Sequence, residues 1–336
     1  MKKIFFGILA MAAMAACATD EPIALNQEAI GFNAFVDNAV RAAVGAADDP
    51  SLTSLTEFKL WGAVDATDNT AVSLYADDTV TGSTVGSGSE WNCTTKTQYW
   101  ISGAKYNFAA VVNAGTVTTG DNQLPATIKY TANGTTDLLY ARSKPYVGKA
   151  NDNEKVAFSF HHLLSKVKFT LQNTTSDAAN VGVYTYTLTD VKITNAITEG
   201  TYTVEDEAVV EDGVTTGYTV KGTWGATATG NQVFDSIEGV TNNTTAECAN
   251  EKLLVPITSA TVSANVNLYF GGKLITTTPL NATVAAGLKA GYAYNLKVVV
   301  GLNKPIQFSV VELKGWENGN TNDSDDDDVK DNVPLN

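Results

Sequence analysis

Two histidines stand side by side at positions 161 and 162, and they are the only imidazoles available for acid–base or metal chemistry. Neighbouring side chains of an extended strand point to opposite faces, so His161 and His162 cannot both bind one metal ion. His162 shares a face with Phe158 and Phe160, which is typical of a hydrogen-bonded histidine inside a core. General acid–base catalysis by His162 is the alternative interpretation.

The other residues that could do chemistry are scattered along the chain. Cys93 has no histidine near it, and the carboxylates lack the spacing of a paired acid and base. The glycine-rich loop from Gly82 to Gly88 is not followed by Lys-Ser or Lys-Thr, so it is no phosphate-binding loop. The run Asp325 to Asp328 lacks the spaced ligands and turn glycine of a calcium loop. We therefore expect no enzyme, no cofactor and no metal, with an enzyme kept as the third alternative because folds bring distant residues together.

Cys17 is a candidate for covalent modification because of the segment that precedes it. Lys2 and Lys3 precede the apolar run Ile4–Ala16, whose last residues are small. A charged start, a short apolar stretch and small residues before the cut make a secretory signal. With cysteine after the cut, the segment resembles a bacterial lipoprotein signal, in which the thiol is acylated with chains such as palmitate. The alternatives are an ordinary cut near Ala18 and a short membrane anchor, although the run is short for a bilayer.

Arginine occurs at two positions, 41 and 142. Arg41 follows the first predicted strand and is flanked by small residues, with Ala42 directly after it. Such surroundings leave the bond between Arg41 and Ala42 open to a protease. The alternative is a plain surface arginine.

The composition limits the partners. The 336 residues carry a net charge of −14, with 22 Lys+Arg against 36 Asp+Glu. Such a surface repels nucleic acid phosphates and gains nothing from anionic lipid headgroups. At 44% hydrophobic, the chain can still bury sizeable cores. These features fit a protein that is soluble at a cell surface, and they name no partner.

The strands are predicted from period-two alternation of apolar and polar residues and from frequent turn residues. The clearest pattern covers Lys155–Gln172, with a bend at Leu163-Leu164. Long helical stretches are absent, so the chain is predicted to be all-β. Further strands are predicted at Ala29–Val36, Glu57–Val64, Tyr99–Asn113, Tyr184–Ile193, Gly200–Val204, Tyr218–Lys221, Lys252–Ile257, Val262–Phe270, Tyr292–Val300 and Ile306–Leu313.

The predicted organisation has five parts. Residues 1–16 are the lipoprotein signal peptide and residues 17–27 a tether. The polar segment Lys149–Glu154 separates an N-terminal domain, 28–150, from a C-terminal domain, 151–317. Residues 318–336 form an acidic disordered tail, because closely packed like charges repel one another. A disulfide between Cys93 and Cys248 would have to cross the two domains, and the sequence leaves that pairing open.

Several segments, taken in order, resemble the fimbrillin family, the lipoprotein-derived subunits of type V pili. The strongest match is Phe158–Phe169, with His162 at the histidine of the family. Val40-Arg41-Ala42 resembles the arginine that follows the first strand of the family. The other matching segments are Ile30–Ala34, Tyr99–Phe108, Asp137–Ala141, Val191–Asn195, Gly200–Tyr202, Leu253–Pro256, Ala290–Tyr294, Ile306–Ser309 and Trp316.

The resemblance implies two tandem β-sandwich domains of fimbrillin type, export to the outer membrane surface and anchoring through Cys17. It also implies that an arginine-directed protease cuts after Arg41. The strand Ala29–Val36 would then leave, and a strand of another fimbrial subunit would fill the groove, which is a form of β-strand addition. The chain would thus be a structural and adhesive fimbrial subunit.

The sequence departs from the family beyond Trp316. Polymerising subunits donate a C-terminal strand, which should alternate apolar residues, whereas this tail is acidic and offers only Val329, Val333 and Leu335. The departure favours a tip, accessory or anchor subunit. The alternative function is a monomeric surface lipoprotein that binds glycans or host proteins. Its exposed aromatic residues would be Trp91, Tyr99 and Trp100, although core packing is the more common role of such residues.

Overall fold

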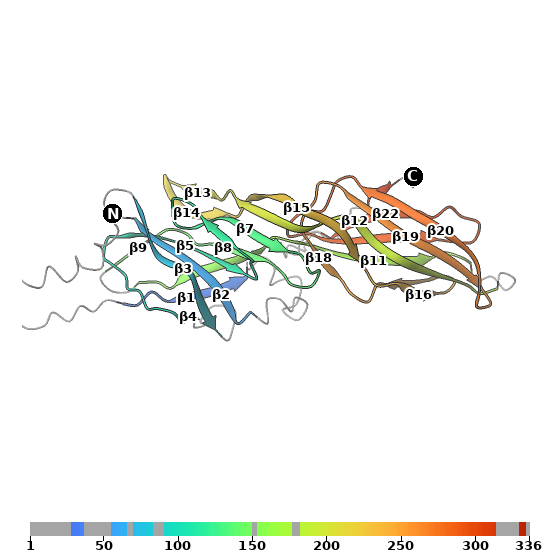
Figure 1. Ribbon diagram of the computed structural model, residues 1–336, viewed down its shortest axis with the longest axis horizontal. Coiled ribbons are helices and arrows are strands. Elements are labelled where there is room, and N and C mark those ends of the chain that lie inside the picture. Colours follow the sequence, from blue (N-terminus) through green and yellow to red (C-terminus); the bar gives the residue numbers. More distant parts are fainter. Residues whose placement is uncertain are drawn as a thin grey trace, which may run out of the picture.

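The computed structural model describes residues 28–36, 55–65, 70–82, 91–149, 153–176, 182–313 and 329–333, and in these ranges every regular element is a β-strand. The molecule is elongated, with the early strands at one end and the late strands at the other (Figure 1). Within the described ranges, no helix has the length and apolar character needed to cross a membrane. The predicted all-β class is confirmed.

The N-terminal body is an eight-stranded sheet with the order β2-β3-β4-β1-β10-β8-β5-β9. Because β2 also pairs with β5, the order returns to its start and two walls of the sheet face each other. A cluster rich in aromatic side chains fills the space between the walls, with Phe32, Phe58, Phe108 and Phe158 among its members. The strands are β1 (Phe32–Val36), β2 (Glu57–Asp65), β3 (Ala71–Gly82), β4 (Trp91–Cys93), β5 (Lys105–Val112), β8 (Leu139–Arg142), β9 (Tyr146–Val147) and β10 (Val156–His162).

The C-terminal body is a sandwich of two sheets. One sheet has the order β17-β11-β21-β22-β23, with β18 also paired to β11. Its strands are β11 (Ser165–Asn173), β17 (Thr244–Glu247), β18 (Lys252–Leu254), β21 (Ala293–Val300), β22 (Gln307–Leu313) and β23 (Val329–Val333).

The second sheet has the order β20-β19-β12-β7-β6, with β15 and β16 also paired to β12. An aliphatic core lies between the two sheets, and it includes Val167, Leu171 and Leu296 from one sheet and Leu188 and Val262 from the other. The strands of the second sheet are β6 (Val117–Thr119), β7 (Pro125–Thr131), β12 (Tyr184–Val204), β15 (Gly222–Val233), β16 (Ile237–Val240), β19 (Ala260–Phe270) and β20 (Lys273–Val284).

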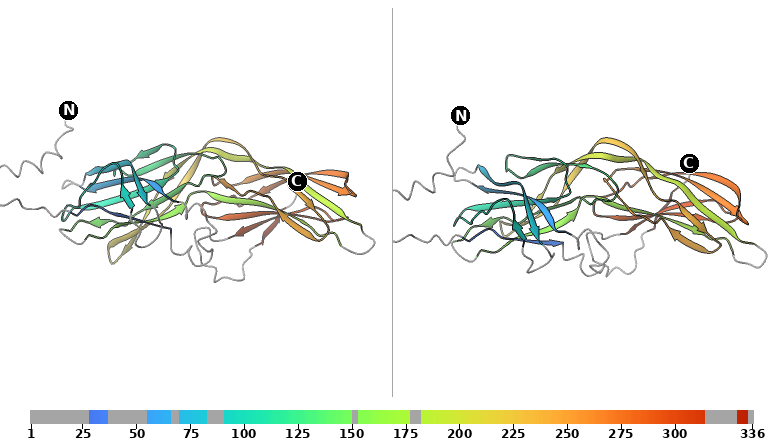
Figure 2. Two further views of the ribbon diagram at one scale, coloured as in Figure 1. Left: turned by 90° about the horizontal axis from the view of Figure 1, so that it is seen from below. Right: turned by 60° about the horizontal axis from the view of Figure 1, so that its bottom comes forward.

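Strand β12 joins the two bodies. It is 21 residues long, and its first half pairs with β19 while its last residues pair with β7. A third buried cluster lies at this junction and includes Trp61 and Tyr140 from the N-terminal sheet together with Tyr202 and Val255. The views in Figure 2 show the long strands passing through the middle of the molecule. The two bodies are therefore joined by a common buried cluster and by β7, which lies between β5 and β8 in the chain and pairs with β12.

The boundary between the two bodies lies later in the chain than the boundary predicted from the sequence. The predicted boundary between residues 150 and 151 precedes β10, yet β10 pairs with β1 and β8 of the N-terminal body. The chain changes bodies at Leu163 and Leu164, both fully buried, and β11 then enters the C-terminal sandwich. Residues 329–333 also differ from the predicted disordered tail, because they form β23 on the edge of β22.

A hairpin from the second half of the chain packs against the first. It consists of β13 (Glu207–Glu211) and β14 (Val214–Thr219), which Figure 1 shows beside the N-terminal strands. The Arg142 guanidinium lies over the Tyr218 ring, 4.5 Å from its centroid. The Tyr140 hydroxyl donates a hydrogen bond to Asp206 Oδ2 at 2.6 Å. Burial raises the pKa of Asp206, and the hydrogen bond from Tyr140 opposes that rise only in part.

The raised pKa of Asp206 predicts a measurable dependence of stability on pH. The folded protein holds this proton more tightly than the unfolded chain, so the contribution is present below the unfolded pKa of about 3.9 and is lost as the pH rises through the folded pKa. Relative to Asp206→Asn, the wild-type free energy of unfolding should fall as the pH rises above about 3.9, as urea titrations would measure. A difference between the wild type and Asp206→Asn that stays constant with pH would contradict the account.

Candidate functional site

The first strand occupies a slot between two strands that come much later in the sequence. β1 runs parallel to β10 over five residue pairs, from Phe32 opposite Val156 to Val36 opposite Phe160. On its other side β1 meets β4 at a single pair, Phe32 with Trp91. We call this position, bounded by β4 and β10, the β1 seat.

The β1 seat is lined by the aromatic core. Ile30, Phe32 and Ala34 alternate along the segment and are 6%, 1% and 0% exposed, so a single face of the strand fills the seat. The Phe32 ring contacts three other rings, with centroid distances of 5.8 Å to Tyr75, 6.1 Å to Phe108 and 6.3 Å to Phe158. Burying a side chain such as Phe stabilises a fold by about 1.5–3 kcal/mol, so Phe32 is the main anchor of β1.

The residues before β1 are held mainly by backbone bonds. The Ile30 amide donates to Gln98 O at 2.9 Å, and the Trp100 amide donates to Glu28 O at 3.1 Å. The Glu28 carboxylate accepts the Asn153 amide at 2.8 Å. Since these contacts are few and peripheral, the hold on β1 depends on its pairing with β10 and on its three apolar side chains.

Removal of β1 would open a strand-binding site. β10 would lose its hydrogen-bond partner over residues 156–160, and the rings around Phe32 would face solvent. An unpaired strand edge above an apolar pocket binds an extended chain through backbone bonds and alternate side chains. The arrangement therefore supports strand addition.

A second edge lies at the far end of the chain. β23 pairs antiparallel with β22, from Phe308 opposite Val333 to Val311 opposite Val329, with a bulge beside Ser309. It forms the outer strand of its sheet and covers the edge of β22.

The three predicted modification residues fall where the structure gives no description. Cys17, Arg41 and Ala42 lie outside the described residues. Arg142, by contrast, is in β8, which is paired on one side with β10 and on the other with β5. Its guanidinium donates to Phe108 O at 3.2 Å and lies over Tyr218.

The prediction that His162 is a hydrogen-bonded histidine inside the core is confirmed. His162 is 2% exposed, and its Nδ1 lies 2.5 Å from Asp137 Oδ2. His161, on the opposite face of β10, is half-buried. Within the described ranges there is no cluster of three or more His, Cys, Asp and Glu side chains able to hold a metal ion.

Cys93 and Cys248 are both free thiols. Cys93 is in β4 of the N-terminal sheet, and Cys248 is buried in the core of the C-terminal sandwich. Burial raises the pKa of the Cys248 thiol, which disfavours the reactive thiolate.

The three aromatic residues considered for ligand binding have different environments. Trp91 and Trp100 are 1% and 3% exposed and belong to the aromatic core, whereas Tyr99 is 47% exposed. An exposed platform made of all three residues is therefore excluded. The two tryptophans shape the β1 seat instead, since Trp91 pairs with Phe32.

Sequence reasoning missed strand β3 and its contribution to the site. Tyr75 is completely buried against Phe32, and burial raises its pKa, which keeps the phenol neutral. Gly82 ends β3 where the Trp91 indole lies, and a Cβ at this position would overlap the indole. The pairing of β3 with β2 shifts register between Tyr75 and Asp78, where Asp77 has a positive φ, and this irregularity breaks the alternation that would have revealed the strand.

The comparisons place this architecture beside known proteins. Residues 41–316 match the sequence model of a family described as fimbrillin-like. No curated protein sequence matches the chain. Among solved structures, a candidate cell adhesion protein from Bacteroides uniformis is 16% identical, with 87% of this chain and 99% of that chain covered at a TM-score of 0.48.

Two other solved structures have comparable coverage. A fimbrial assembly protein from Parabacteroides distasonis is 14% identical, covering 92% of this chain and 99% of that chain at a TM-score of 0.47. The fimbrial anchor protein Mfa2 from Porphyromonas gingivalis is 12% identical, covering 86% of this chain and 98% of that chain at a TM-score of 0.37.

The central place of Phe32 in the seat can be tested by substitution. Phe32→Ala should lower the free energy of unfolding by about 3–5 kcal/mol, because a buried ring is lost and a cavity is left. Tyr99→Ala removes a neighbouring aromatic side chain that is nearly half exposed, and it should cost about 1 kcal/mol or less. Urea unfolding of the full chain measures both values, and equal losses would contradict the anchoring role of Phe32.

Proposed function

The chain belongs to the fimbrillin-like family, and from this premise we propose that it is a structural and adhesive fimbrial subunit that assembles by exchange of a β-strand. The β1 seat carries the proposal, because it combines a strand paired chiefly on one side with an apolar pocket lined by aromatic rings. Strand addition requires such an edge and such pockets.

The proposed site of action is the outer membrane surface. The signal-like segment before Cys17 supports export, cleavage and acylation of the thiol. More than one acyl chain would be needed for a stable anchor. In this arrangement the lipid is attached at Cys17, and β1 begins at Phe32 of the same chain segment.

The proposed trigger is a cut between Arg41 and Ala42. An arginine-directed protease has two possible targets in this chain. Arg142 is a poor one, because it pairs with Ala109 of β5 and its guanidinium is held by Phe108 O and the Tyr218 ring, whereas a protease needs an extended, accessible segment. Arg41 is flanked by small residues and is the better target.

A cut after Arg41 would have two consequences at once. β1 would be joined to the body only by noncovalent contacts, and the acylated Cys17 would stay on the same fragment as β1. Departure of β1 would therefore open the seat and release the body from the lipid anchor in one step.

The incoming strand is proposed to come from a different subunit. A donor must place apolar side chains where Ile30, Phe32 and Ala34 now lie. In a regular donor strand, the C-terminal segment of this chain would place Asp331 between Val329 and Val333 on one face. Burying that unpaired carboxylate in place of Phe32 would cost several kcal/mol. This mismatch supports a tip, accessory or anchor position.

Strand exchange can be tested with the full chain and synthetic peptides. After cleavage by an arginine-specific protease and removal of β1, a fluorescent peptide of residues 28–36 should bind and raise the fluorescence anisotropy. The same peptide with Phe32→Asp should bind at least about a hundredfold more weakly, because it brings a carboxylate into the apolar seat.

Arg41→Lys provides the matched control, since it keeps the charge but removes the protease site. This variant should stay uncut and should bind neither peptide. Binding of the two peptides with equal affinity, or binding to the uncut variant, would refute the exchange mechanism.

A further inference from the structure

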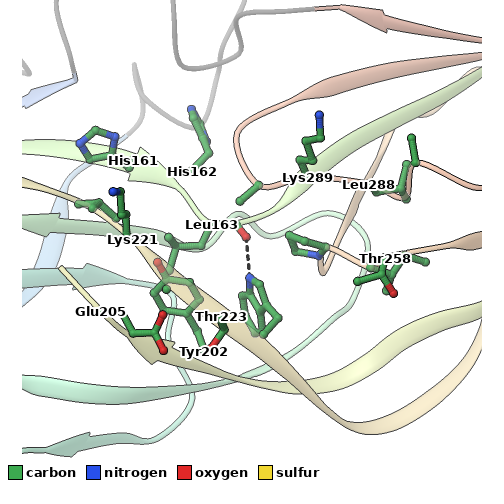
Figure 3. Close-up of a pocket in the computed structure, with 17 residues that line it drawn as sticks. His161, His162, Leu163, Tyr202, Glu205, Lys221, Thr223, Thr258, Leu288 and Lys289 are labelled. Atoms are coloured by element: carbon green, nitrogen blue, oxygen red, sulfur yellow. Dashed lines mark hydrogen bonds between the residues drawn. The ribbon is translucent and has the colours of Figure 1, made fainter. Parts of the chain in front are cut away.

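A second site lies at the junction of the two bodies, outside the β1 seat. It is a cavity of about 680 Å³ beside the place where β10 passes into β11 (Figure 3). Its walls come from the end of β10, the end of β12, the start of β15 and two loops, residues 256–258 and 286–290. Its volume falls within the range of small-ligand sites.

Aromatic rings form one wall of this cavity. Tyr202 is 3% exposed, and the Trp224 ring lies 5.4 Å from it between centroids. The Trp224 indole N–H donates to Leu163 O at 3.1 Å, drawn as the dashed line in Figure 3, which fixes the orientation of the ring. Gly222 lets Tyr202 lie close to β15, because a Cβ there would overlap the Tyr202 ring. Ile257 and Leu288 continue the apolar wall.

Polar groups of both signs surround the aromatic wall. Glu205, Lys221 and Lys289 bring a carboxylate and two ammonium groups, while Thr223 and Thr258 bring hydroxyls. All five residues are exposed at the rim, and the labelled side chains in Figure 3 come from opposite sides of the cavity. Lys221 also forms an ion pair with Glu207, so its charge is largely compensated.

From this combination we propose that the junction cavity binds a short, neutral oligosaccharide. A sugar ring has apolar C–H faces that pack on aromatic rings, and its hydroxyls both donate and accept hydrogen bonds. The cavity offers fixed rings together with donors and acceptors at the rim. A purely apolar ligand would not use the donors and acceptors at the rim, and the presence of a carboxylate together with ammonium groups favours a ligand without net charge.

The proposal goes beyond the fimbrial function and does not rest on it. β1 contributes no residue to the cavity, whose lining begins at His161, after the last residue of β10 that pairs with β1. Saccharide binding should therefore be the same before and after β1 is removed. Failure of strand exchange and failure of saccharide binding can be told apart.

The test uses the uncut full chain and four named probes. Calorimetric titration with maltotriose, cellotriose and mannotriose measures the binding of neutral sugars with different linkages. Titration with sialyllactose measures the binding of an acidic sugar. We expect saturable binding of at least one neutral probe, and Glu205→Gln and Lys289→Gln should each weaken it at least about tenfold. Both residues are exposed, so an unchanged melting temperature can confirm that the variants are folded.

Glu238→Gln and Lys273→Gln are matched controls, since they make the same changes at exposed positions that do not line the cavity. These two variants should bind as tightly as the wild type. Lack of binding of all three neutral probes, binding of sialyllactose alone, or equal weakening by the control variants would overturn the assignment.

Discussion

Every strand of an all-β protein presents backbone donors and acceptors that must be paired or left at an edge. This constraint governs the molecule most visibly at β10, whose hydrogen bonds on one side depend on five residues of β1. Phe32 places a ring among Tyr75, Phe108 and Phe158, so the same five residues complete the aromatic core. β1 thus both pairs the edge of β10 and completes the core. Another strand with apolar side chains at the same positions could therefore replace it.

The contacts that join the two bodies lie away from β1. β12 and the turn between β10 and β11 couple the two halves through shared pairing and a common buried cluster. The hairpin β13–β14 adds the contact between Arg142 and Tyr218. None of these contacts involves β1. Loss of β1 would expose the seat without removing the links between the bodies, and the junction cavity belongs to those links.

Strands with strong alternation of apolar and polar residues could be predicted from the sequence. Pairings between distant segments could not. Phe158, Phe160 and His162 were predicted to share a buried face, and they do. The sequence could not show that β10 belongs with the N-terminal strands, because its partner β1 is more than a hundred residues away. β15 and β20 were missed because runs of exposed residues, many of them threonine, replace the alternation. β3 was missed because a register shift between Tyr75 and Asp78 interrupts it. The cavity went unpredicted because its residues converge from distant segments.

The claim that β1 is a removable strand is tested most directly on the protein recovered from its native cell surface. Intact mass and N-terminal sequencing would identify the first residue of the assembled form. The account predicts an N-terminus at Ala42, without acyl mass, in material that is part of a polymer. An acylated N-terminus at Cys17 in all recovered protein would contradict it and would indicate an uncut, membrane-held lipoprotein.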